Sequence, residues 1–291
     1  MQENVIVLKW KDDTVFWKYI DKIPIEKFYY QSNMNVMMKF IRKINLDILI
    51  WGDWKKRVKE YTHIIIFDNG YKENIARYIK KKNHQCKIIF YYWNPIMENN
   101  KKFLADPNLD EIWTFDKRDA EKYGLKYNPQ FYTSNIKLDD DNITNDVYFL
   151  GRAKNRAEDI KSVENKLLEQ GIKTNFNIIY TEKDTISYTE YLNNVSYSKS
   201  ILDITDPSQT GLTLRCLESI FLEKKLITNN RDIKNYDFYK KNNIFIIGED
   251  DFSQIKSFLN SNYEKIEEEV KEKYDFEKWL NRILETKKKG E

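Results

Sequence analysis

Short apolar runs rich in β-branched residues alternate with polar, helix-like segments along the whole chain. The same alternation occurs in both halves, without an internal repeat or a low-complexity block. Strands separated by helices in this way form βαβ units, in which neighbouring strands are parallel. The pattern therefore predicts the α/β class with two parallel sheets. At 291 residues the chain is long enough for two domains of about 150 residues each.

The expected strands are apolar runs that end at polar residues or glycine. They cover residues 4–8, 27–30, 63–67, 86–92 and 111–115 in the first half, and 146–150, 175–180, 200–204, 225–228 and 243–247 in the second, with a further short apolar run at 46–50. Helical patterns cover 35–41, 71–82, 117–123, 157–169, 188–196, a segment opening near 211, 252–259 and 263–284. Gly171 is a candidate C-cap, because glycine tolerates a left-handed conformation.

A polar stretch separates the two halves. Between residues 128 and 145 the periodicity gives way to Asn, Asp, Ser and Thr around Pro129, which indicates a linker. We therefore expect an N-terminal Rossmann-like domain at 1–135, a C-terminal one at 146–262 and a terminal helical segment at 263–291. Apolar residues recur at helical spacing in that tail, which predicts that it packs against the rest of the protein.

The most informative stretch for function is 203–218, which follows the apolar run 200–204 and opens a helical pattern. Gly211 lets the backbone approach a ligand closely, and Thr213 is suited to cap the turn. The unpaired N–H groups and partial positive charge of a helix N-terminus suit a phosphate. An ordinary helix start in an α/β domain is the alternative interpretation of this segment.

Two charged residues follow on that helix. Arg215 and Glu218 are three positions apart and so share one helix face. Arg215 adds a permanent cation beside the helix start, and Glu218 lies where a carboxylate could accept ribose hydroxyls. Together with the helix start they predict a site for a nucleotide diphosphate.

A basic loop follows the first strand of the second half. Gly151 permits a tight turn there, and Arg152, Lys154 and Arg156 place three cations at the strand end. Arginine can bind phosphate oxygens with two parallel hydrogen bonds, whereas lysine acts as a point charge. Ligands bind beyond the carboxyl ends of strands in open α/β sheets, so this loop is expected to form one wall of a pyrophosphate site. A solvated surface loop is the alternative.

These motifs carry a resemblance to a known family. Leu150-Gly-Arg152, followed by Gly211-Leu-Thr-Leu-Arg-Cys-Leu-Glu218 and Lys224-Lys-Leu-Ile-Thr-Asn-Asn230, resembles the donor domain of GT-B glycosyltransferases. The chain is most similar to members that build bacterial lipopolysaccharide and capsular polysaccharide, of the group 1-like type. The resemblance covers about residues 146–230 and is only architectural over the first half.

The resemblance implies two Rossmann-like domains that face each other across a cleft, with a C-terminal helix returning to the first domain. The implied donor-binding residues are Gly211, Leu212, Thr213 and Arg215 at the diphosphate, Glu218 at the ribose, and Arg152 and Lys154 at the leaving diphosphate. The implied donor is a nucleotide-diphosphate sugar, with a UDP-sugar as the first choice. Because cationic side chains supply the positive charge, no metal or other cofactor is expected.

The implied acceptor is a growing cell-surface glycan on a lipid carrier. A cytoplasmic enzyme with weak peripheral contacts to the inner face of the cytoplasmic membrane is therefore expected. One departure from the family concerns the mechanism: retaining members often carry two glutamates eight positions apart, and the position eight before Glu218 is Thr210. The choice between inversion and retention stays open. An inverting enzyme would need a base in the first half.

Carboxylates at first-half strand ends are the candidates for that base. Asp68 closes a clean apolar strand before a glycine, Asp13 lies in the first loop beside Asp12, and Asp116 follows the strand at 111–115. We take Asp68 and Asp13 as the catalytic candidates. For Asp68 and Asp116, helix capping is the alternative role, since Asp is favoured at helix N-termini.

Aromatic residues after the strand at 86–92 are candidates for the acceptor site. Trp93 and Asn94 follow that strand directly, and aromatic faces stack on pyranose rings. We expect these two residues to bind the acceptor, with core packing as the alternative for Trp93.

Composition excludes several other classes. The formal net charge is only +3, and no basic stripe with interleaved aromatics occurs, so no nucleic-acid partner is expected. The two histidines have no metal-ligand spacing, and the two cysteines lie in apolar stretches typical of buried thiols in a reducing compartment. We find no secretory signal and no run of 18 apolar residues. Oligomeric state is not indicated.

A D-x-D spacing at Asp139–Asp141 resembles a divalent-metal motif. It lies in the polar linker with no apolar strand leading into it, so we interpret it as a solvated loop. Two other functions stay open: another sugar-nucleotide enzyme such as an epimerase, and a non-catalytic partner or scaffold protein with a degenerate donor site. A dehydrogenase is disfavoured, because no G-x-G-x-x-G follows the first strand of either half.

Overall fold

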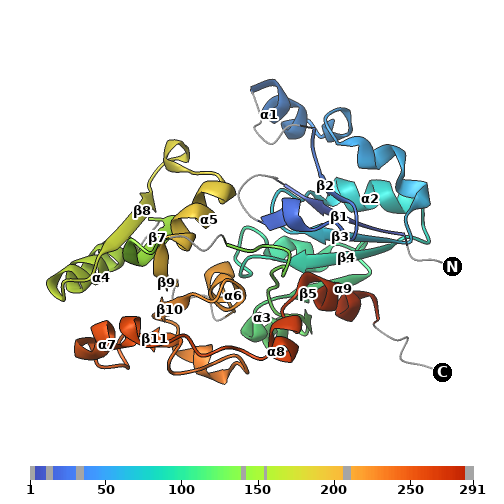
Figure 1. Cartoon of the computed structure of the whole chain (residues 1–291). Helices are drawn as coiled ribbons and strands as arrows, with labels where there is room; N and C mark the ends of the chain where they lie inside the picture. Colours follow the sequence, from blue (N-terminus) through green and yellow to red (C-terminus); the bar gives the residue numbers. More distant parts are fainter. Residues whose placement is uncertain are drawn as a thin grey trace. The chain divides into compact units, whose positions relative to one another are not determined.

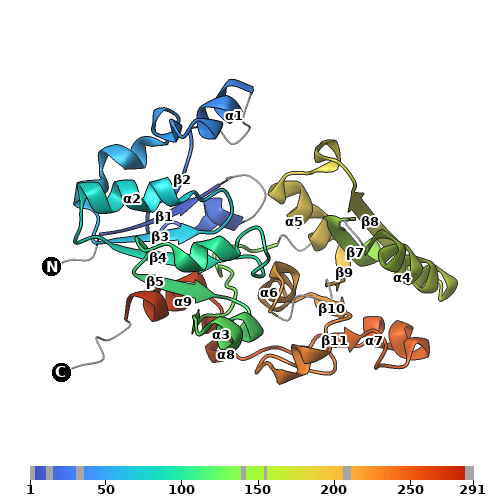
Figure 2. The ribbon, with the colours of Figure 1, turned by 180° about the vertical axis from the view of Figure 1, so that it is seen from behind.

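The computed structural model describes residues 4–10, 16–30, 36–138, 142–153, 156–205 and 211–285. The chain divides into two compact units, Met1–Pro129 and Gln130–Glu291. Each unit contains one parallel sheet with helices against it (Figures 1 and 2). These sheets confirm the predicted α/β class and the two Rossmann-like domains that the GT-B resemblance implies. The predicted domain boundaries, and the packing of residues 263–291 on the first domain, stay predictions.

The first sheet has the strand order β2-β1-β3-β4-β5-β6, and its neighbouring strands pair in parallel. Its strands are β1 (Val5–Lys9), β2 (Ile25–Lys27), β3 (His63–Phe67), β4 (Lys87–Tyr92), β5 (Glu111–Thr114) and β6 (Lys126–Tyr127). The α-helices of this unit are α1 (Val36–Lys43), α2 (Glu73–Lys82) and α3 (Lys117–Tyr123). Its 3-10 helices are η1 (Phe16–Tyr19), η2 (Asp47–Leu49), η3 (Asp53–Lys56), η4 (Val58–Glu60) and η5 (Lys101–Ala105).

The second sheet has the order β11-β10-β9-β7-β8 and is also parallel. Its strands are β7 (Asn145–Arg152), β8 (Thr174–Ile179), β9 (Ser198–Asp203), β10 (Lys225–Thr228) and β11 (Ile244–Ile246). Its α-helices are α4 (Ala157–Glu169), α5 (Tyr188–Ser196), α6 (Leu214–Phe221), α7 (Ile255–Asn260), α8 (Glu268–Glu272) and α9 (Phe276–Leu284). Its 3-10 helices are η7 (Glu182–Asp184), η8 (Arg231–Asn235) and η9 (Phe252–Gln254).

Continuous apolar strands explain both sheets. Ile64, Ile65 and Ile66 of β3 are all buried, although they alternate between the two faces of the sheet. A strand buried on both faces must be apolar throughout, which is the signature of a parallel sheet covered by helices. Burial of each such side chain contributes about 1.5–3 kcal/mol. In the second unit, Leu202 of β9 and Ile227 of β10 belong to the corresponding core.

Two local expectations were wrong, and two short elements were not predicted. The second strand lies at Ile25–Lys27 and not at 27–30, and the run at 46–50 contains the 3-10 helix η2, where Asp47 is buried. The two-residue strand β6 was not predicted. The expected turn at Gly151 is absent, because Gly151 lies within β7. This glycine makes room for a ring: a Cβ there would lie 2.8 Å from the Phe149 side chain.

The tail does not form one helix over 263–284. Tyr132 interrupts it: its N–H donates to the Tyr274 carbonyl at 2.8 Å, and its carbonyl accepts from the Phe276 N–H at 2.9 Å. This bridge diverts the backbone between α8 and α9. Asp275 then caps α9, where its side chain accepts from the Glu277 N–H. Trp279 of α9 packs on Phe131, with ring centroids 4.3 Å apart. The predicted left-handed Gly171 after α4 is confirmed, with a φ of 69°.

Candidate functional site

Each sheet has a point where the strand order reverses. In the second sheet the chain runs from β7 to β8 on one side and then crosses to β9 on the other. The first sheet reverses in the same way between β1 and β3. Loops that follow the two central strands diverge at such a point and leave a crevice at the carboxyl ends, where open α/β sheets bind ligands. A ligand site is therefore expected at the carboxyl ends of β7 and β9 in the second unit, and of β1 and β3 in the first.

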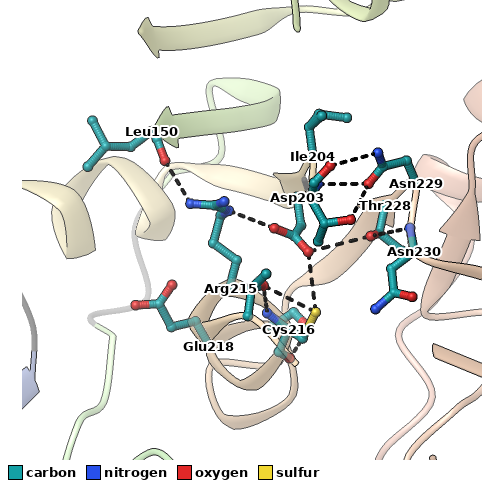
Figure 3. A network of polar contacts seen from close by, with 12 residues as sticks. Leu150, Asp203, Ile204, Arg215, Cys216, Glu218, Thr228, Asn229 and Asn230 are labelled. Atoms are coloured by element: carbon teal, nitrogen blue, oxygen red, sulfur yellow. Dashed lines mark hydrogen bonds and ion pairs between the residues drawn. The ribbon is translucent and has the colours of Figure 1, made fainter. Parts of the chain in front are cut away.

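Arg215 spans the reversal point of the second sheet. Its Nε donates to Asp203 Oδ1 at 3.0 Å, and its Nη1 donates to the Leu150 carbonyl at 3.1 Å (Figure 3). Asp203 is the last residue of β9, and Leu150 lies near the end of β7. Arg156 also crosses this gap, since its Nη1 donates to the Ile204 carbonyl. Two arginines thus join the carboxyl ends of β7 and β9.

The Asp203 carboxylate is enclosed. It is fully buried, and besides Arg215 it lies 3.4 Å from the Cys216 sulfur and 3.5 Å from the Thr228 hydroxyl, both of which donate to Oδ2. Burial alone would lower the pKa of Arg215, but Asp203, Tyr191 and Glu218 beside it raise that pKa above its usual value. Arg215 therefore stays a cation at every pH at which the fold persists. Asp203 fixes its position.

The N-terminus of α6 is held as the sequence predicts. Thr213 is the N-cap, and its hydroxyl accepts from the Cys216 N–H at 3.4 Å. Gly211 and Leu212 are buried directly before it. Burial raises the pKa of the Cys216 thiol well above its usual value, so this cysteine is a buried thiol as predicted. The first turn of α6 therefore begins next to the ends of β7 and β9.

Glu218 lies on the same side of α6 as Arg215, with its carboxylate turned away from Asp203 (Figure 3). It is only 2% exposed. The hydroxyls of Tyr188 and Tyr191 donate to its two oxygens at 2.7 and 2.5 Å, and Tyr188 also contacts the Tyr132 hydroxyl at 2.7 Å. Burial raises the pKa of Glu218, and the two tyrosine hydrogen bonds oppose that increase.

Asparagines after β10 complete this edge. The Asn229 side chain accepts from the Thr205 N–H at 2.8 Å and from its hydroxyl at 2.9 Å, which ties the loop after β9 to the end of β10. Asn230 accepts from the Asp232 N–H at 3.0 Å, and its Nδ2 is buried with no hydrogen-bond partner among the described residues. Most of the polar side chains described at the carboxyl ends of β7, β9 and β10 are therefore hydrogen-bonded within the protein.

In the first unit, three predicted residues lie together. Asp68 follows β3, and its Oδ1 accepts from the Trp93 N–H at 2.9 Å, while its Oδ2 accepts from the Asn94 side chain at 3.2 Å. Asp68 is buried, Trp93 is half-buried and Asn94 is exposed. Burial raises the pKa of Asp68 to about 6, although the hydrogen bonds from Asn94 and Trp93 oppose the increase. A buried carboxylate thus lies directly beneath an exposed polar side chain.

Helix capping, the alternative role for both Asp68 and Asp116, is found for Asp116 but not for Asp68. Asp116 is the N-cap of α3 and accepts from the Arg118 and Asp119 N–H groups at 2.9 and 3.3 Å. Asp68 caps no helix, because α2 begins after Lys72 and has no side-chain cap. Trp93 does pack against aromatic neighbours, with its ring centroid 5.3 Å from that of Phe67.

Some predicted residues fall outside the described part of the chain, namely Asp13, Lys154 and the D-x-D segment Asp139–Asp141. Arg152 is described: it is the last residue of β7 and is exposed. Among described residues, no group of three or more His, Cys, Asp or Glu side chains could hold a metal ion. Nor does any described helix combine the length and apolarity needed to cross a membrane.

Sequence reasoning did not assign roles to Asp203, Tyr188 or Tyr191. Asp203 carried a usable signal, because it ends an apolar strand in the same manner as Asp68. The two tyrosines carried none, since tyrosines in a helix are common and their hydroxyl partner lies about 30 residues away in the sequence. The structure brings Arg215 to the strand end that carries Arg152. The donor roles of these residues and of Glu218 stay predictions.

Comparisons with known proteins add little. No protein-family model and no curated protein matches the sequence. Among solved structures, the chain is similar to a GtfA/B complex bound to UDP and GlcNAc, with 14% identity, a TM-score of 0.32 and coverage of 85% of this chain and 57% of that chain. It is also similar to NAD+-bound 3-phosphoglycerate dehydrogenase of Entamoeba histolytica, with 10% identity, a TM-score of 0.27 and coverage of 99% and 97%. The chain therefore spans less than two thirds of the GtfA/B chain, and neither likeness carries an argument about activity.

Proposed function

We propose that this protein transfers a sugar from a nucleotide-diphosphate donor to an acceptor hydroxyl, with the second unit binding the donor and the first unit binding the acceptor. The observation that carries the proposal is the position of Arg215 at the reversal point of the second sheet. Two of its nitrogens are held by Asp203 and Leu150, and Nη2 has no partner among the described residues. A guanidinium fixed in this way presents a preorganised donor to a phosphate.

The donor side would use three groups. The N–H groups in the first turn of α6 and Arg215 Nη2 would bind the diphosphate, and the exposed Arg152 at the end of β7 would add a second cation. Glu218 would act on the ribose only if it exchanged a tyrosine hydroxyl for a ribose hydroxyl. We expect a UDP-sugar, and no metal ion is required because these cations stabilise the departing diphosphate.

The acceptor side would use Asp68. In an inverting reaction the acceptor oxygen bonds to the anomeric carbon, the bond from that carbon to the phosphate oxygen breaks, and the acceptor proton passes to a base. With a pKa of about 6, Asp68 is ionised at neutral pH and is a stronger base than an ordinary carboxylate. Asn94 and Trp93 would position the acceptor beside it. Asp13 stays a second candidate base.

We further propose that the acceptor is a lipid-linked, growing cell-surface glycan, as in bacterial lipopolysaccharide or capsule synthesis. This would place the protein in the cytoplasm, peripherally on the inner face of the cytoplasmic membrane. The resemblance over residues 146–230 supports this part of the proposal.

A thermal-shift titration with UDP, UDP-sugars, ADP and NAD+ tests the donor side. A nucleotide at one hundred times its Kd adds about 2.7 kcal/mol of stability, which is readily measured. Arg152→Ala should weaken the UDP shift, whereas Lys161→Ala, which removes an exposed cation of α4, should not. Asp68→Asn should keep the UDP shift and lose transfer to the acceptor. A shift with NAD+ but none with any sugar nucleotide would overturn the proposal.

One observation favours a second candidate function, a non-catalytic partner with a degenerate donor site. Both oxygens of Glu218 are already bonded to buried tyrosines, so this residue needs no ligand to be satisfied. Under this alternative no nucleotide shifts the melting temperature, and Arg152→Ala changes nothing. An epimerase would instead convert the sugar nucleotide without an acceptor, which product analysis in acceptor-free reactions would reveal.

A further inference from the structure

The exposed apolar side chains of the first unit are concentrated in one short stretch of its sequence. Of the 14 large apolar side chains that are exposed in the described residues, eight lie between residues 30 and 49: Tyr30, Val36, Met37, Phe40, Ile44, Leu46, Ile48 and Leu49. Single exposed apolar residues are common, but a contiguous group usually marks an interaction site. Figures 1 and 2 place α1 at the margin of the first unit, away from its strands.

Helix α1 has two faces with different environments. Its inner face is occupied: Met38 is buried, Ile41 packs against the core, and Arg42 forms an ion pair with Asp47 at 3.4 Å. At 100° per residue, the opposite face carries Val36, Met37 and Phe40, which are 84%, 64% and 60% exposed. The helix is therefore anchored by one side and presents apolar side chains on the other.

Positive charge borders this apolar face. Lys39 and Lys43 are exposed and lie along one margin of it. Residues 27–46 contain Lys27, Lys39, Arg42 and Lys43 and no Asp or Glu at all. The next acidic residue, Asp47, is buried and bonded to the Lys72 ammonium at 2.9 Å. This stretch alone thus contributes four positive charges to a chain whose net charge is +3.

We propose that the α1–η2 segment, residues 36–49, docks on an anionic lipid surface. An amphipathic helix that combines exposed apolar side chains with lysines at their margin matches the boundary between acyl chains and anionic headgroups. The apolar side chains would enter the acyl boundary, while Lys39 and Lys43 would contact the headgroups. A polar protein partner would not bury this face, and a second copy of the chain would bring its lysines against each other.

The docking segment is connected to the candidate acceptor site. The Arg42 guanidinium lies between the rings of Trp10 and Tyr29, at 5.0 and 4.9 Å, and its Nη2 donates to the Gly70 carbonyl at 3.3 Å. Gly70 is two residues after Asp68. A lipid surface bound by α1 would therefore lie near the carboxylate proposed to act on a lipid-linked acceptor. This connection rests on the proposed function, whereas docking itself does not.

Sedimentation of the full-length protein with phosphatidylglycerol-containing vesicles, and with pure phosphatidylcholine vesicles, tests the proposal. The protein should bind the anionic vesicles more tightly, and binding should weaken as salt is raised. Lys39→Ala with Lys43→Ala should weaken binding about 30-fold, as expected for two lysines near an anionic surface. Phe40→Ser should weaken binding to the anionic vesicles at least about tenfold.

Matched controls lie on α4, where Lys161, Lys166 and Leu168 are exposed. Lys161→Ala with Lys166→Ala, and separately Leu168→Ser, should leave vesicle binding unchanged. Absence of vesicle binding, or equal losses in the α1 and α4 variants, would overturn the proposal. Self-association of the wild-type chain that is abolished by Phe40→Ser would also overturn the proposal. Vesicle binding without any UDP shift would support docking and reject the donor function. A UDP shift without vesicle binding would support the donor function and reject docking.

Discussion

The two strand-end sites differ in how their buried carboxylates are balanced. Asp203, in the second unit, is fully buried and paired with the permanent cation of Arg215. Asp68, in the first unit, is also buried, but the Trp93 N–H and the Asn94 side-chain amide that donate to it are neutral. Neutral donors compensate only part of the cost of burying a charge, so the pKa of Asp68 rises to about 6.

The second unit therefore has a rigid site, in which the Asp203–Arg215 ion pair fixes the geometry. The first unit has a titrating site, in which the charge of Asp68 changes with pH. The Arg215 guanidinium, whose pKa is raised above its usual value, keeps its charge, and its hydrogen bonds to Asp203 and to the Leu150 carbonyl hold the ends of β7 and β9 in one geometry. Burial raises the pKa of Asp68 to about 6, so this carboxylate changes its charge near neutral pH and is suited to exchange a proton. The roles proposed for the two units, fixed binding of a diphosphate and proton abstraction, follow this division.

The largest effect is expected when the cation of the Asp203–Arg215 ion pair is removed. Arg215→Met should destabilise the second unit by about 3–5 kcal/mol, because Asp203 is left buried without a counter-charge. Adding Asp203→Leu in the same chain should recover much of this loss. Urea unfolding followed by circular dichroism measures both. A matched Arg152→Met, at an exposed position, should change stability by less than about 0.5 kcal/mol.

The titrating site can be tested by its pH dependence. Because the folded-state pKa of Asp68 is raised from 3.8 to about 6, its contribution to stability is complete below pH 3.8 and is lost as pH rises through 6. The free energy of unfolding should therefore fall by about 3 kcal/mol as the pH rises from below 3.8 to above 6. Asp68→Asn should remove this pH dependence while retaining an acceptor for the Trp93 N–H.

Tryptophan fluorescence during urea unfolding, repeated from pH 4 to pH 7, reports this change, since six of the seven tryptophans lie in the first 129 residues. The same slope in the wild-type protein and in Asp68→Asn would show that Asp68 titrates normally. In a transfer assay the activity should rise with pH through about 6, as expected for a base with that pKa.

The sequence predicted the strands of both units well, because a strand buried on both faces needs an uninterrupted apolar run. The expected runs at 63–67 and 225–228 coincide with β3 and β10. Short edge elements such as β6 lack such a run, and its two residues are exposed. The break between α8 and α9 depends on Tyr132, a residue about 140 positions earlier, and no local pattern encodes a contact of that separation.

The sequence identified which positions lie at the candidate site, but not which side chains contact one another there. Asp68, Trp93 and Asn94 were each identified by their place after a strand, and adjacent parallel strands bring such places together. Whether Asp68 capped a helix depended on where α2 begins. That Asp203 would engage Arg215, and that two tyrosines would engage Glu218, depended on side-chain packing between elements.

The tyrosine cluster offers a third test of the rigid site. Glu218→Ala should destabilise the second unit by about 2 kcal/mol, because it leaves the Tyr191 hydroxyl buried without its acceptor and removes one partner of Tyr188. Glu218→Gln keeps one acceptor oxygen and should lose about half as much. Urea unfolding by circular dichroism distinguishes them. Equal losses for the two variants would show that the tyrosine hydroxyls find other partners and that the cluster is not a fixed unit.

The smallest expected effect compares one helix cap from each unit. Asp116 accepts two N–H groups at the start of α3, whereas Thr213 accepts one, at 3.4 Å, at the start of α6. An anionic cap also interacts favourably with the partial positive charge of the helix N-terminus. Asp116→Ala should therefore cost about 1.5 kcal/mol and Thr213→Ala about 0.5 kcal/mol in urea unfolding. The weaker cap leaves the N-terminus of α6 more available to an external anion. If Thr213→Ala proved the more costly change, α6 would already be satisfied internally, and the case for a phosphate at its first turn would weaken.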